Sequence, residues 1–291
     1  MDDASAYLLK LARRVAEPYR QLPQLRAFIV TGSVADDSAD VYSDLDLIAY
    51  YDELPSDDEL AAARQHNQAE NFVWFIQARE EGTVADMYDV HGVQCQLMHN
   101  TIAAWEQQMA LILEQHEVET PLHKAMSGVQ KSIPLHGPEL IRQWQERLAG
   151  YPEPLARAMV EHHLQFFPLW GLQAYLDARD AALWRSQMLL EAAQNILGVL
   201  AGLNRRYYTT FQFKRMRHFV EQLAIAPENL SDRLEYLLRA EPGLAAAELE
   251  RLVREIAELV ERHMPEVDTS GARKRLGWRR PAWQLRDDTE L

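Results

Sequence analysis

The first third of the chain alternates between helical and strand-like spacing of its apolar residues. In residues 3–21 the apolar positions recur about every 3.6 residues, which predicts an amphipathic helix closed by Pro23. Alternating or continuous apolar runs then predict strands, with a helix capped by Ser56 after the second of them. The predicted strands cover residues 26–30, 41–51, 72–77, 84–90 and 93–98, and the last two form a hairpin.

Beyond Thr101 the apolar spacing is helical almost throughout. A helix over residues 105–114 precedes a stretch with Pro and Gly, residues 127–138, where we place the junction between two domains. Further helices are predicted over residues 140–148, 155–178, 181–203, 211–224, 229–238 and 244–263. The pattern predicts an α+β protein, with strands and helices in residues 1–135, a helical bundle in 136–265 and a basic, tryptophan-containing tail in 266–291.

Composition and charge narrow the class of protein. The 291 residues exceed one ordinary core, and 47% hydrophobic with 25% charged residues is ordinary for a folded chain. The formal net charge of −14 opposes binding to nucleic acid, because such binding depends on Lys and Arg, and it favours a cationic small molecule. Cys95 is the single cysteine, and the sequence shows no secretory signal and no apolar run of roughly 20 residues. We expect a cytoplasmic protein that does not contact membranes.

One segment combines residue types that bind metal ions and phosphates. An apolar strand ends at Gly32 and Ser33, and the next predicted strand carries Asp44 and Asp46. Side chains two apart on a strand share a face, so these carboxylates would repel each other unless a cation lies between them. Mg²⁺ prefers one or two carboxylates together with phosphate oxygens. Gly32 and Ser33 can offer backbone N–H groups and a hydroxyl to those phosphates.

This segment resembles the signature of the DNA polymerase beta-type nucleotidyltransferase superfamily. The signature is Gly-Ser, a spacer and Asp-x-Asp, which is matched here by Gly32-Ser33, ten intervening residues and Asp44-Leu45-Asp46. The surrounding letters YSDLDL are similar to those of the aminoglycoside and lincosamide adenylyltransferases, whose second domain is all-helical. The likeness in motif covers the first 105 residues, and over the helical half it is architectural.

The resemblance implies a fold, a reaction and residue roles. The fold would be a mixed sheet with flanking helices, followed by the helical bundle. Asp44 and Asp46 would hold two Mg²⁺ ions, and Gly32 and Ser33 would orient a nucleoside triphosphate, with ATP as the first candidate. A hydroxyl of the acceptor would attack the α-phosphorus, and pyrophosphate would leave. The implied acceptor is a small hydroxylated molecule, such as an aminoglycoside- or lincosamide-like antibiotic.

A cationic acceptor would suit the acidic stretch that surrounds the motif. Residues 36–59 contain ten Asp or Glu and no Lys or Arg, so their field would attract a positively charged molecule. A solvated loop and a helix cap account for most of the same residues.

The chain departs from the family pattern at one position. These enzymes place a third carboxylate on a later strand, whereas here that strand carries Gln94 and Gln96. Glutamine can bind a metal through its carbonyl oxygen, but it cannot accept a proton from the acceptor. Three explanations stay open: another group is the base, turnover is slow, or the chain binds a nucleotide without transferring it. The candidates for another base are Asp86, Asp89, Glu161, His162 and Glu191.

The helical half offers further candidates for substrate contact. Lys214 follows a segment rich in cations and aromatics, and we expect it to contact the phosphates, with Tyr207 or Tyr208 stacking on the nucleotide base. Packing aromatics beside solvated arginines would explain the segment equally well.

Trp170 either lines a substrate cleft or belongs to the core. The basic tail binds phosphate, pairs with the acidic surface of residues 36–59 or remains disordered. Transfer to a protein side chain is an alternative to transfer to a small molecule.

Overall fold

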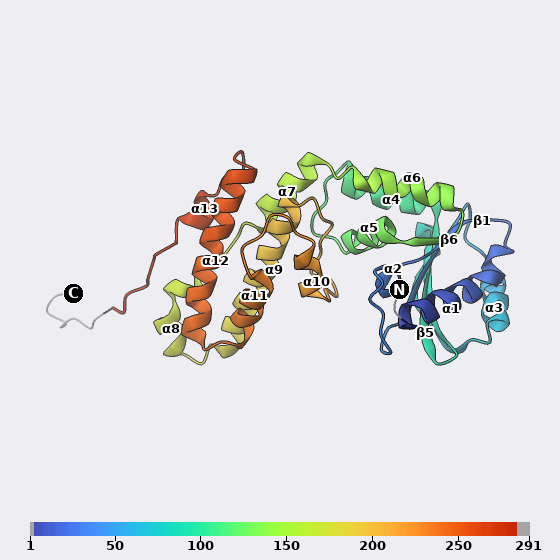
Figure 1. Ribbon diagram of the computed structural model, residues 1–291, viewed down its shortest axis with the longest axis horizontal. Coiled ribbons are helices and arrows are strands. Elements are labelled where there is room, and N and C mark those ends of the chain that lie inside the picture. Colours follow the sequence, from blue (N-terminus) through green and yellow to red (C-terminus); the bar gives the residue numbers. More distant parts are fainter. Residues whose placement is uncertain (1–2, 284–291) are drawn as a thin grey trace. The chain divides into compact units, whose positions relative to one another are not determined.

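The computed structural model describes residues 3–283 of the chain, which divide into two compact units (Figure 1). Unit 1 comprises Met1–Glu117 and Leu122–Tyr151, and unit 2 comprises Val118–Pro121 and Pro152–Leu291. Among the helices of residues 3–283, none combines the length and the apolar character needed to cross a membrane.

The boundary between the units lies later in the chain than residue 135, where the sequence predicted it. Strand β6 (Ile133–His136) pairs with β1 (Leu25–Val30), and helix α6 (Pro138–Ala149) contacts both strands. The stretch with Pro and Gly therefore completes the first unit. It contains the end of helix α5 (Leu122–Lys131), so it is ordered structure that belongs to unit 1.

Unit 1 is built on a six-stranded mixed sheet with the strand order β3-β4-β5-β2-β1-β6. Strands β2 and β5 are parallel, and all other neighbours are antiparallel. The remaining strands are β2 (Leu45–Tyr51), β3 (Glu70–Ala78), β4 (Thr83–Val90) and β5 (Val93–Thr101). The sheet, its flanking helices and the helical second unit confirm the predicted α+β class. The predicted β4–β5 hairpin is also confirmed, with positive φ at both turn residues, His91 and Gly92.

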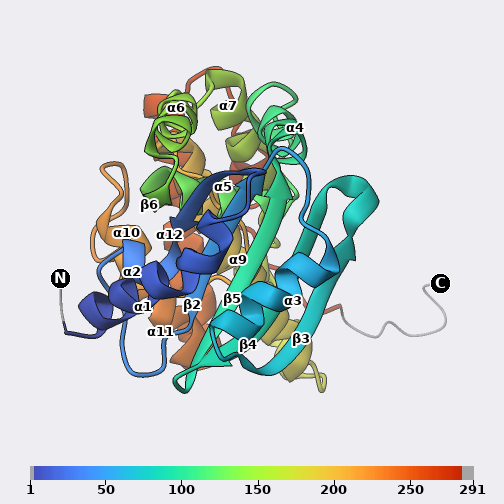
Figure 2. The ribbon, with the colours of Figure 1, turned by 90° about the vertical axis from the view of Figure 1, so that its right-hand side faces the viewer.

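Helices α1 (Asp3–Arg20) and α3 (Asp57–His66) lie against one face of this sheet (Figure 2). The alternation along β2 places Leu45 and Leu47 in the core under these helices, where both are almost completely buried. Asp46 and Ile48 point to the opposite face and are half-buried. The alternation of apolar and polar residues thus carries Asp46 away from the core.

Helices α4 (Ile102–Leu113) and α6 pack on the face that carries Asp46, and α5 contacts both of them, whereas α2 (Gly32–Ala35) contacts α1. Tyr50 of β2 packs against Trp105 of α4 and Trp144 of α6, with ring centroids 5.6 and 4.7 Å apart. These aromatic contacts bury the end of β2 near Tyr50. The half-buried Asp46 lies toward the other end of the strand.

Asp86 of β4 belongs to a polar network within the core. Its side chain is completely buried, accepts a hydrogen bond from Arg64 Nη1 at 2.6 Å and lies 3.4 Å from His99 Nε2. The Tyr51 hydroxyl lies 3.0 Å from His99 Nδ1. Burial, and then the charge of Asp86, raises the pKa of Tyr51. Asp86 is therefore wrong as a candidate base, because it is held on the buried side of the sheet.

We expect Asp86→Asn to lower the free energy of unfolding by about 3 kcal/mol, because the Arg64 guanidinium would lose its buried counter-charge. Urea unfolding followed by circular dichroism measures this change. Asp89→Asn, on the same strand but half-exposed, is the matched control and should cost about 0.5 kcal/mol or less. Equal stability of Asp86→Asn and wild type would mean that the ion pair contributes no net free energy.

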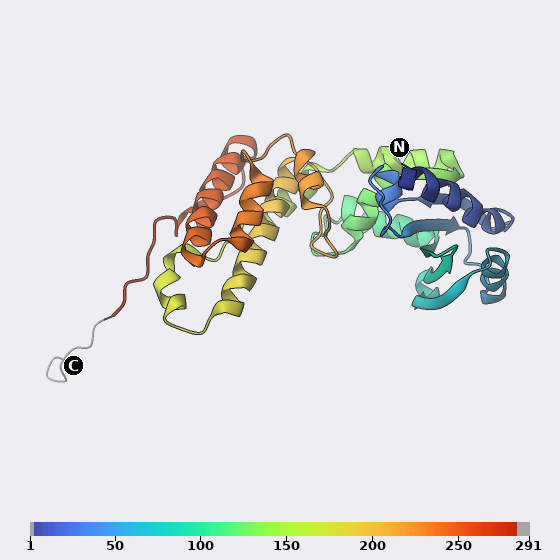
Figure 3. The ribbon, with the colours of Figure 1, turned by 60° about the horizontal axis from the view of Figure 1, so that its bottom comes forward.

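Unit 2 consists of helices. They are α7 (Glu153–His163), α8 (Gln173–Asp177), α9 (Ala182–Leu203), α10 (Met216–Glu221), α11 (Leu230–Arg239), α12 (Pro242–His263) and α13 (Ser270–Arg273). The long helix α9 packs against α7 and α12, and α11 packs beside α12 (Figure 3).

Two helices of unit 2 are shorter than the sequence predicted. The helix predicted over residues 155–178 is interrupted: α7 ends at His163, and Pro168, which lacks an N–H donor and disfavours helical backbone in the residue before it, prevents a continuous helix through to α8. The helix predicted over residues 211–224 is reduced to α10, which begins after Arg215, a residue with left-handed backbone (φ +59).

The basic tail, as far as residue 283, is attached to unit 2. Arg279 pairs with Glu250 at 2.7 Å, and the indole N–H of Trp170 donates to the Arg275 carbonyl at 2.9 Å. Hydrogen bonds from Arg273 and from Thr269 hold the pKa of Glu261 down at about 2. Ion pairs with carboxylates of α12 thus account for Arg273 and Arg279. The last part of the predicted tail, residues 284–291, lies outside the described residues.

Candidate nucleotide site

The Gly-Ser turn lies directly against Asp46. The backbone N–H of Thr31 donates to the Asp46 carbonyl at 3.0 Å, and Gly32 follows with φ +64. A Cβ atom on Gly32 would lie 2.2 Å from Asp46 Oδ2 and 3.1 Å from its Cγ. The left-handed backbone and this close approach both require glycine. Position 32 must therefore lack a side chain for the Asp46 carboxylate to occupy its place.

Ser33 presents a hydroxyl with an unused hydrogen-bonding capacity. Its Oγ is buried and has no partner among the described residues. The Ser33 carbonyl accepts a hydrogen bond from the Ser38 N–H at 2.9 Å, which fixes the turn. A buried hydroxyl without a partner costs free energy, and Ser33 Oγ shares this state with other buried polar atoms, such as the Tyr50 hydroxyl.

Asp44 immediately precedes β2, whereas the sequence predicted it within the strand. Its Oδ2 accepts a hydrogen bond from Gln96 Nε2 at 2.9 Å, and the same nitrogen lies 3.3 Å from Gln94 Oε1. Gln96 is also the direct partner of Asp46 in the parallel β2–β5 ladder. The structure thus brings Asp44, Asp46 and Gln96 together, with Gln94 beside them.

The donor set of this site suits a metal ion that arrives with phosphates. Within residues 3–283, no group of three or more His, Cys, Asp or Glu side chains is arranged to hold a metal ion. The Asp44 carboxylate instead bonds to the Gln96 amide, and Gln96 is the strand partner of Asp46. Mg²⁺ commonly takes one or two carboxylates and completes its shell with phosphate oxygens and waters. Asp44 and Asp46 therefore fit such an ion.

Helix α5 places a cation beside the turn. Gly128 approaches Thr31 so closely that a Cβ atom would lie 2.8 Å from Thr31 Oγ1. At the end of the same helix, Lys131 Nζ lies 3.2 Å from Oδ1 of Asp36, the residue that follows α2. The sequence interpretation missed Lys131 because it treated this stretch as a linker. The spacing of His123, Met126 and Val129, which are all buried, was the signal for a helix.

Several predicted site residues belong to unit 2. Lys214 is exposed in the segment that precedes α10, and the alternative bases Glu161, His162 and Glu191 lie on α7 and α9. Their roles stay predictions.

The expected stacking of Tyr207 or Tyr208 on a nucleotide base is wrong, because both side chains are in the core of unit 2. They are only 6% and 2% exposed, and burial raises the pKa of both hydroxyls. The Tyr208 hydroxyl donates to the Gln194 carbonyl at 3.0 Å, and its ring packs against His163 and Phe213. Trp170 is also buried, so of the two readings of this residue the core one holds.

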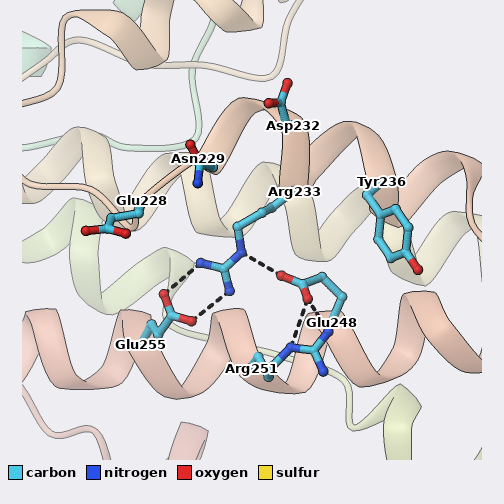
Figure 4. Close-up of a pocket in the computed structure, with 8 residues that line it drawn as sticks. All are labelled: Glu228, Asn229, Asp232, Arg233, Tyr236, Glu248, Arg251 and Glu255. Atoms are coloured by element: carbon cyan, nitrogen blue, oxygen red, sulfur yellow. Dashed lines mark hydrogen bonds and ion pairs between the residues drawn. The ribbon is translucent and has the colours of Figure 1, made fainter.

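The groove between α11 and α12 is unsuited to a triphosphate (Figure 4). Figure 4 shows Arg233 between Glu255 and Glu248, and the guanidinium bonds to both at 2.6–2.7 Å. Arg251 pairs with Glu248, and Asp232 adds a further carboxylate to the lining. The carboxylates already engage both cations, so a polyanion would meet net negative charge here.

Comparisons with known proteins give weak likenesses. No family model matches this chain, and no curated protein matches it. Solved structures that resemble it include a nucleotidyltransferase-like protein from Exiguobacterium sibiricum, with 15% identity, a TM-score of 0.37, and coverage of 89% of this chain and 80% of that chain. Another is a CCA-adding enzyme in complex with CTP, with 11% identity, a TM-score of 0.28, and coverage of 99% and 83%. Likenesses of this strength assign neither a family nor an activity.

Proposed function

We propose that the chain is a magnesium-dependent nucleotidyltransferase that moves a nucleoside monophosphate from a triphosphate to a hydroxyl of a small molecule. The observation that carries this proposal is the fit of the Asp46 carboxylate beneath Gly32, at a distance that a Cβ atom would forbid. The buried, unpartnered Ser33 hydroxyl and the Asp44 carboxylate lie at the same turn and strand end. A metal-bound triphosphate requires carboxylates for the metal ion and hydrogen-bond donors for the phosphates. The carboxylate pair can supply the first, and the turn with its hydroxyl can supply the second.

Each of these residues has a role in the proposed reaction. Asp44 and Asp46 would hold magnesium, which supplies positive charge to the phosphate oxygens when it is bound. The Ser33 hydroxyl donates to the triphosphate, and the Gly32 backbone lets the phosphates approach. The acceptor oxygen attacks the α-phosphorus, and pyrophosphate leaves with the electrons of the broken bond. These residues contribute mainly positioning and electrostatic stabilisation.

The acceptor that suits the charge of this chain is a cationic, hydroxylated molecule, and ATP is the first candidate for the donor. The net charge is −14, and residues 36–59 around the motif contain no Lys or Arg. Such a field raises the local concentration of cations. An aminoglycoside carries both the amines and the hydroxyls that this requires, whereas a lincosamide carries fewer positive charges.

The test is incubation with each of the four ribonucleoside triphosphates, Mg²⁺ and panels of aminoglycosides and lincosamides. Release of pyrophosphate is measured, and mass spectrometry of the acceptor shows the added nucleotide. The proposal fails if no triphosphate binds in the presence of Mg²⁺.

We propose Lys131, which pairs with Asp36 beside the turn, as a cation of unit 1 that contacts the phosphates. We expect Lys131→Gln to weaken Mg²⁺–ATP binding about tenfold, the size of one charge-assisted hydrogen bond. Titration calorimetry measures the Kd. Lys10→Gln, which removes the same charge from an exposed position on α1, should leave the Kd unchanged. Equal affinity of Lys131→Gln and wild type would assign Lys131 only to its ion pair with Asp36.

A second candidate function is nucleotide binding without transfer, and the Gln96 amide favours it. This amide donates to Asp44, where the resemblance implies a carboxylate that would accept a proton. A binding module would hold Mg²⁺–nucleotide tightly and release no pyrophosphate with any acceptor. Robust formation of product excludes it.

A further inference from the structure

The register of three neighbouring strands brings another carboxylate onto the face of the candidate site. Asp46 of β2 pairs with Gln96 of β5, and Gln94 of β5 pairs with Asp89 of β4. Residues that pair directly point to the same face of a sheet, and residues two apart on a strand do so too. Asp89 therefore lies on the same face as Asp46 and both glutamines.

Asp89 and Asp86 differ because their spacing of three places them on opposite faces of β4. Asp86 is completely buried against Arg64. Asp89 is half-buried, and its Oδ2 accepts a hydrogen bond from Asn71 Nδ2 at 2.7 Å. This contact from β3 orients the Asp89 carboxylate without neutralising its charge.

The two glutamine amides lie on β5, the strand between Asp89 on β4 and Asp44 at the start of β2. Gln96 Nε2 lies 2.9 Å from Asp44 Oδ2 and 3.3 Å from Gln94 Oε1, and Gln94 is the direct neighbour of Asp89 across the strands. Two strand spacings separate the backbones of Asp44 and Asp89, about 10 Å.

The resemblance implies three carboxylates, and this face carries three: Asp44, Asp46 and Asp89. The third lies on β4 and not on β5, where the resemblance places it. In residues 3–283 no three acids converge as metal ligands, so Asp89 does not join Asp44 and Asp46 around one ion. A carboxylate that lies on the same face of the sheet as Asp46 but does not bind the metal ion can accept a proton, because its oxygens remain basic.

We propose that Asp89 is the general base for the acceptor hydroxyl, an inference that rests on the proposed nucleotidyl transfer. The Asp89 carboxylate takes the hydroxyl proton while the acceptor oxygen forms its bond to the α-phosphorus. The bond between the α-phosphorus and the oxygen bridging to the β-phosphorus breaks, and pyrophosphate leaves with that electron pair. Asp89 then releases the proton to water. Gln94 and Gln96 accept and donate hydrogen bonds that position the acceptor between the two carboxylates.

The test measures kcat for the wild type and three variants. Each protein is assayed with ATP, Mg²⁺ and the acceptor that the antibiotic panel identifies. Asp89→Asn should lower kcat about 10²-fold or more, the usual contribution of a general base, while the Kd of Mg²⁺–ATP stays unchanged. Asp89→Asn combined with Gln94→Glu returns a carboxylate to the neighbouring strand, and it should recover about tenfold of the lost kcat. Glu70→Gln removes a charge from the exposed residue that pairs with Asp89 on β3, and it should transfer at the wild-type rate.

The outcomes separate this inference from the function on which it rests. A wild-type protein that transfers no nucleotide to any acceptor overturns both. Wild-type kcat in Asp89→Asn overturns the role of Asp89 and leaves the transferase standing. A fall in kcat with a parallel loss of ATP binding, or with a lowered melting temperature, assigns Asp89 to structure and overturns its role as base. Recovery by Gln94→Glu supports the proposal, because a structural defect at Asp89 would not respond to a carboxylate on β5.

Discussion

Asp46→Asn should lower kcat for nucleotidyl transfer by about 10³-fold, the upper range for loss of one electrostatic group in an active site. The side chain keeps its shape and its place beneath Gly32, but the amide is neutral and turns an N–H donor toward the site. Magnesium would lose a carboxylate that no neighbour replaces, because the adjacent Gln96 is itself an amide. Pyrophosphate release under saturating ATP measures kcat, and calorimetry with and without Mg²⁺ measures binding.

The control for this substitution is Asp58→Asn, which removes the same charge from an exposed position in the first turn of α3. It should transfer at the wild-type rate, which separates the role of Asp46 from the general acidity of residues 36–59. Thermal melts of both variants show whether the fold is retained. If Asp46→Asn transfers nucleotide with wild-type kcat, the Asp46 carboxylate has no role in the reaction.

Gly32→Ala should lower kcat about 10²-fold, the effect of a misplacement of about 1 Å at a reacting centre. The added Cβ would meet Asp46 Oδ2 at 2.2 Å, so the carboxylate must move. The positive φ at position 32 also adds strain of about 1 kcal/mol for an L side chain. Two effects are thus expected: a fall in stability and a larger fall in activity.

Gly92→Ala separates these two effects. Gly92, in the β4–β5 turn, has φ +76, and an added Cβ would meet nothing within 4 Å. This variant should lose about the same stability, about 1 kcal/mol, with unchanged kcat. If Gly32→Ala loses stability but keeps wild-type kcat, the close approach to Asp46 has no part in the chemistry.

The elements that form the candidate site were largely predictable from local patterns. Alternation along residues 45–51 places Asp46 opposite the buried leucines, and the hairpin across His91-Gly92 follows from its turn residues. The motif order of Gly32-Ser33 and Asp44-Leu45-Asp46 pointed to a turn beside a carboxylate pair. Two predictions were wrong because two local patterns overlapped. The Pro and Gly residues in 127–138 indicated a linker, although α5 continues to Lys131. The helical spacing in 155–178 indicated one helix, although it is interrupted before Pro168.

The sequence by itself determined that a glycine turn with a hydroxyl follows the first strand and that two carboxylates stand at the start of the next, because strand periodicity and turn chemistry are local. Only the tertiary structure decided that Gly32 touches Asp46, that Gln96 bonds to Asp44, and that Lys131 lies beside Asp36. It also decided between Asp86 and Asp89, since a shift of one residue in the β4–β5 register would exchange their faces. These contacts depend on strand register and helix packing between distant segments, which no local pattern specifies.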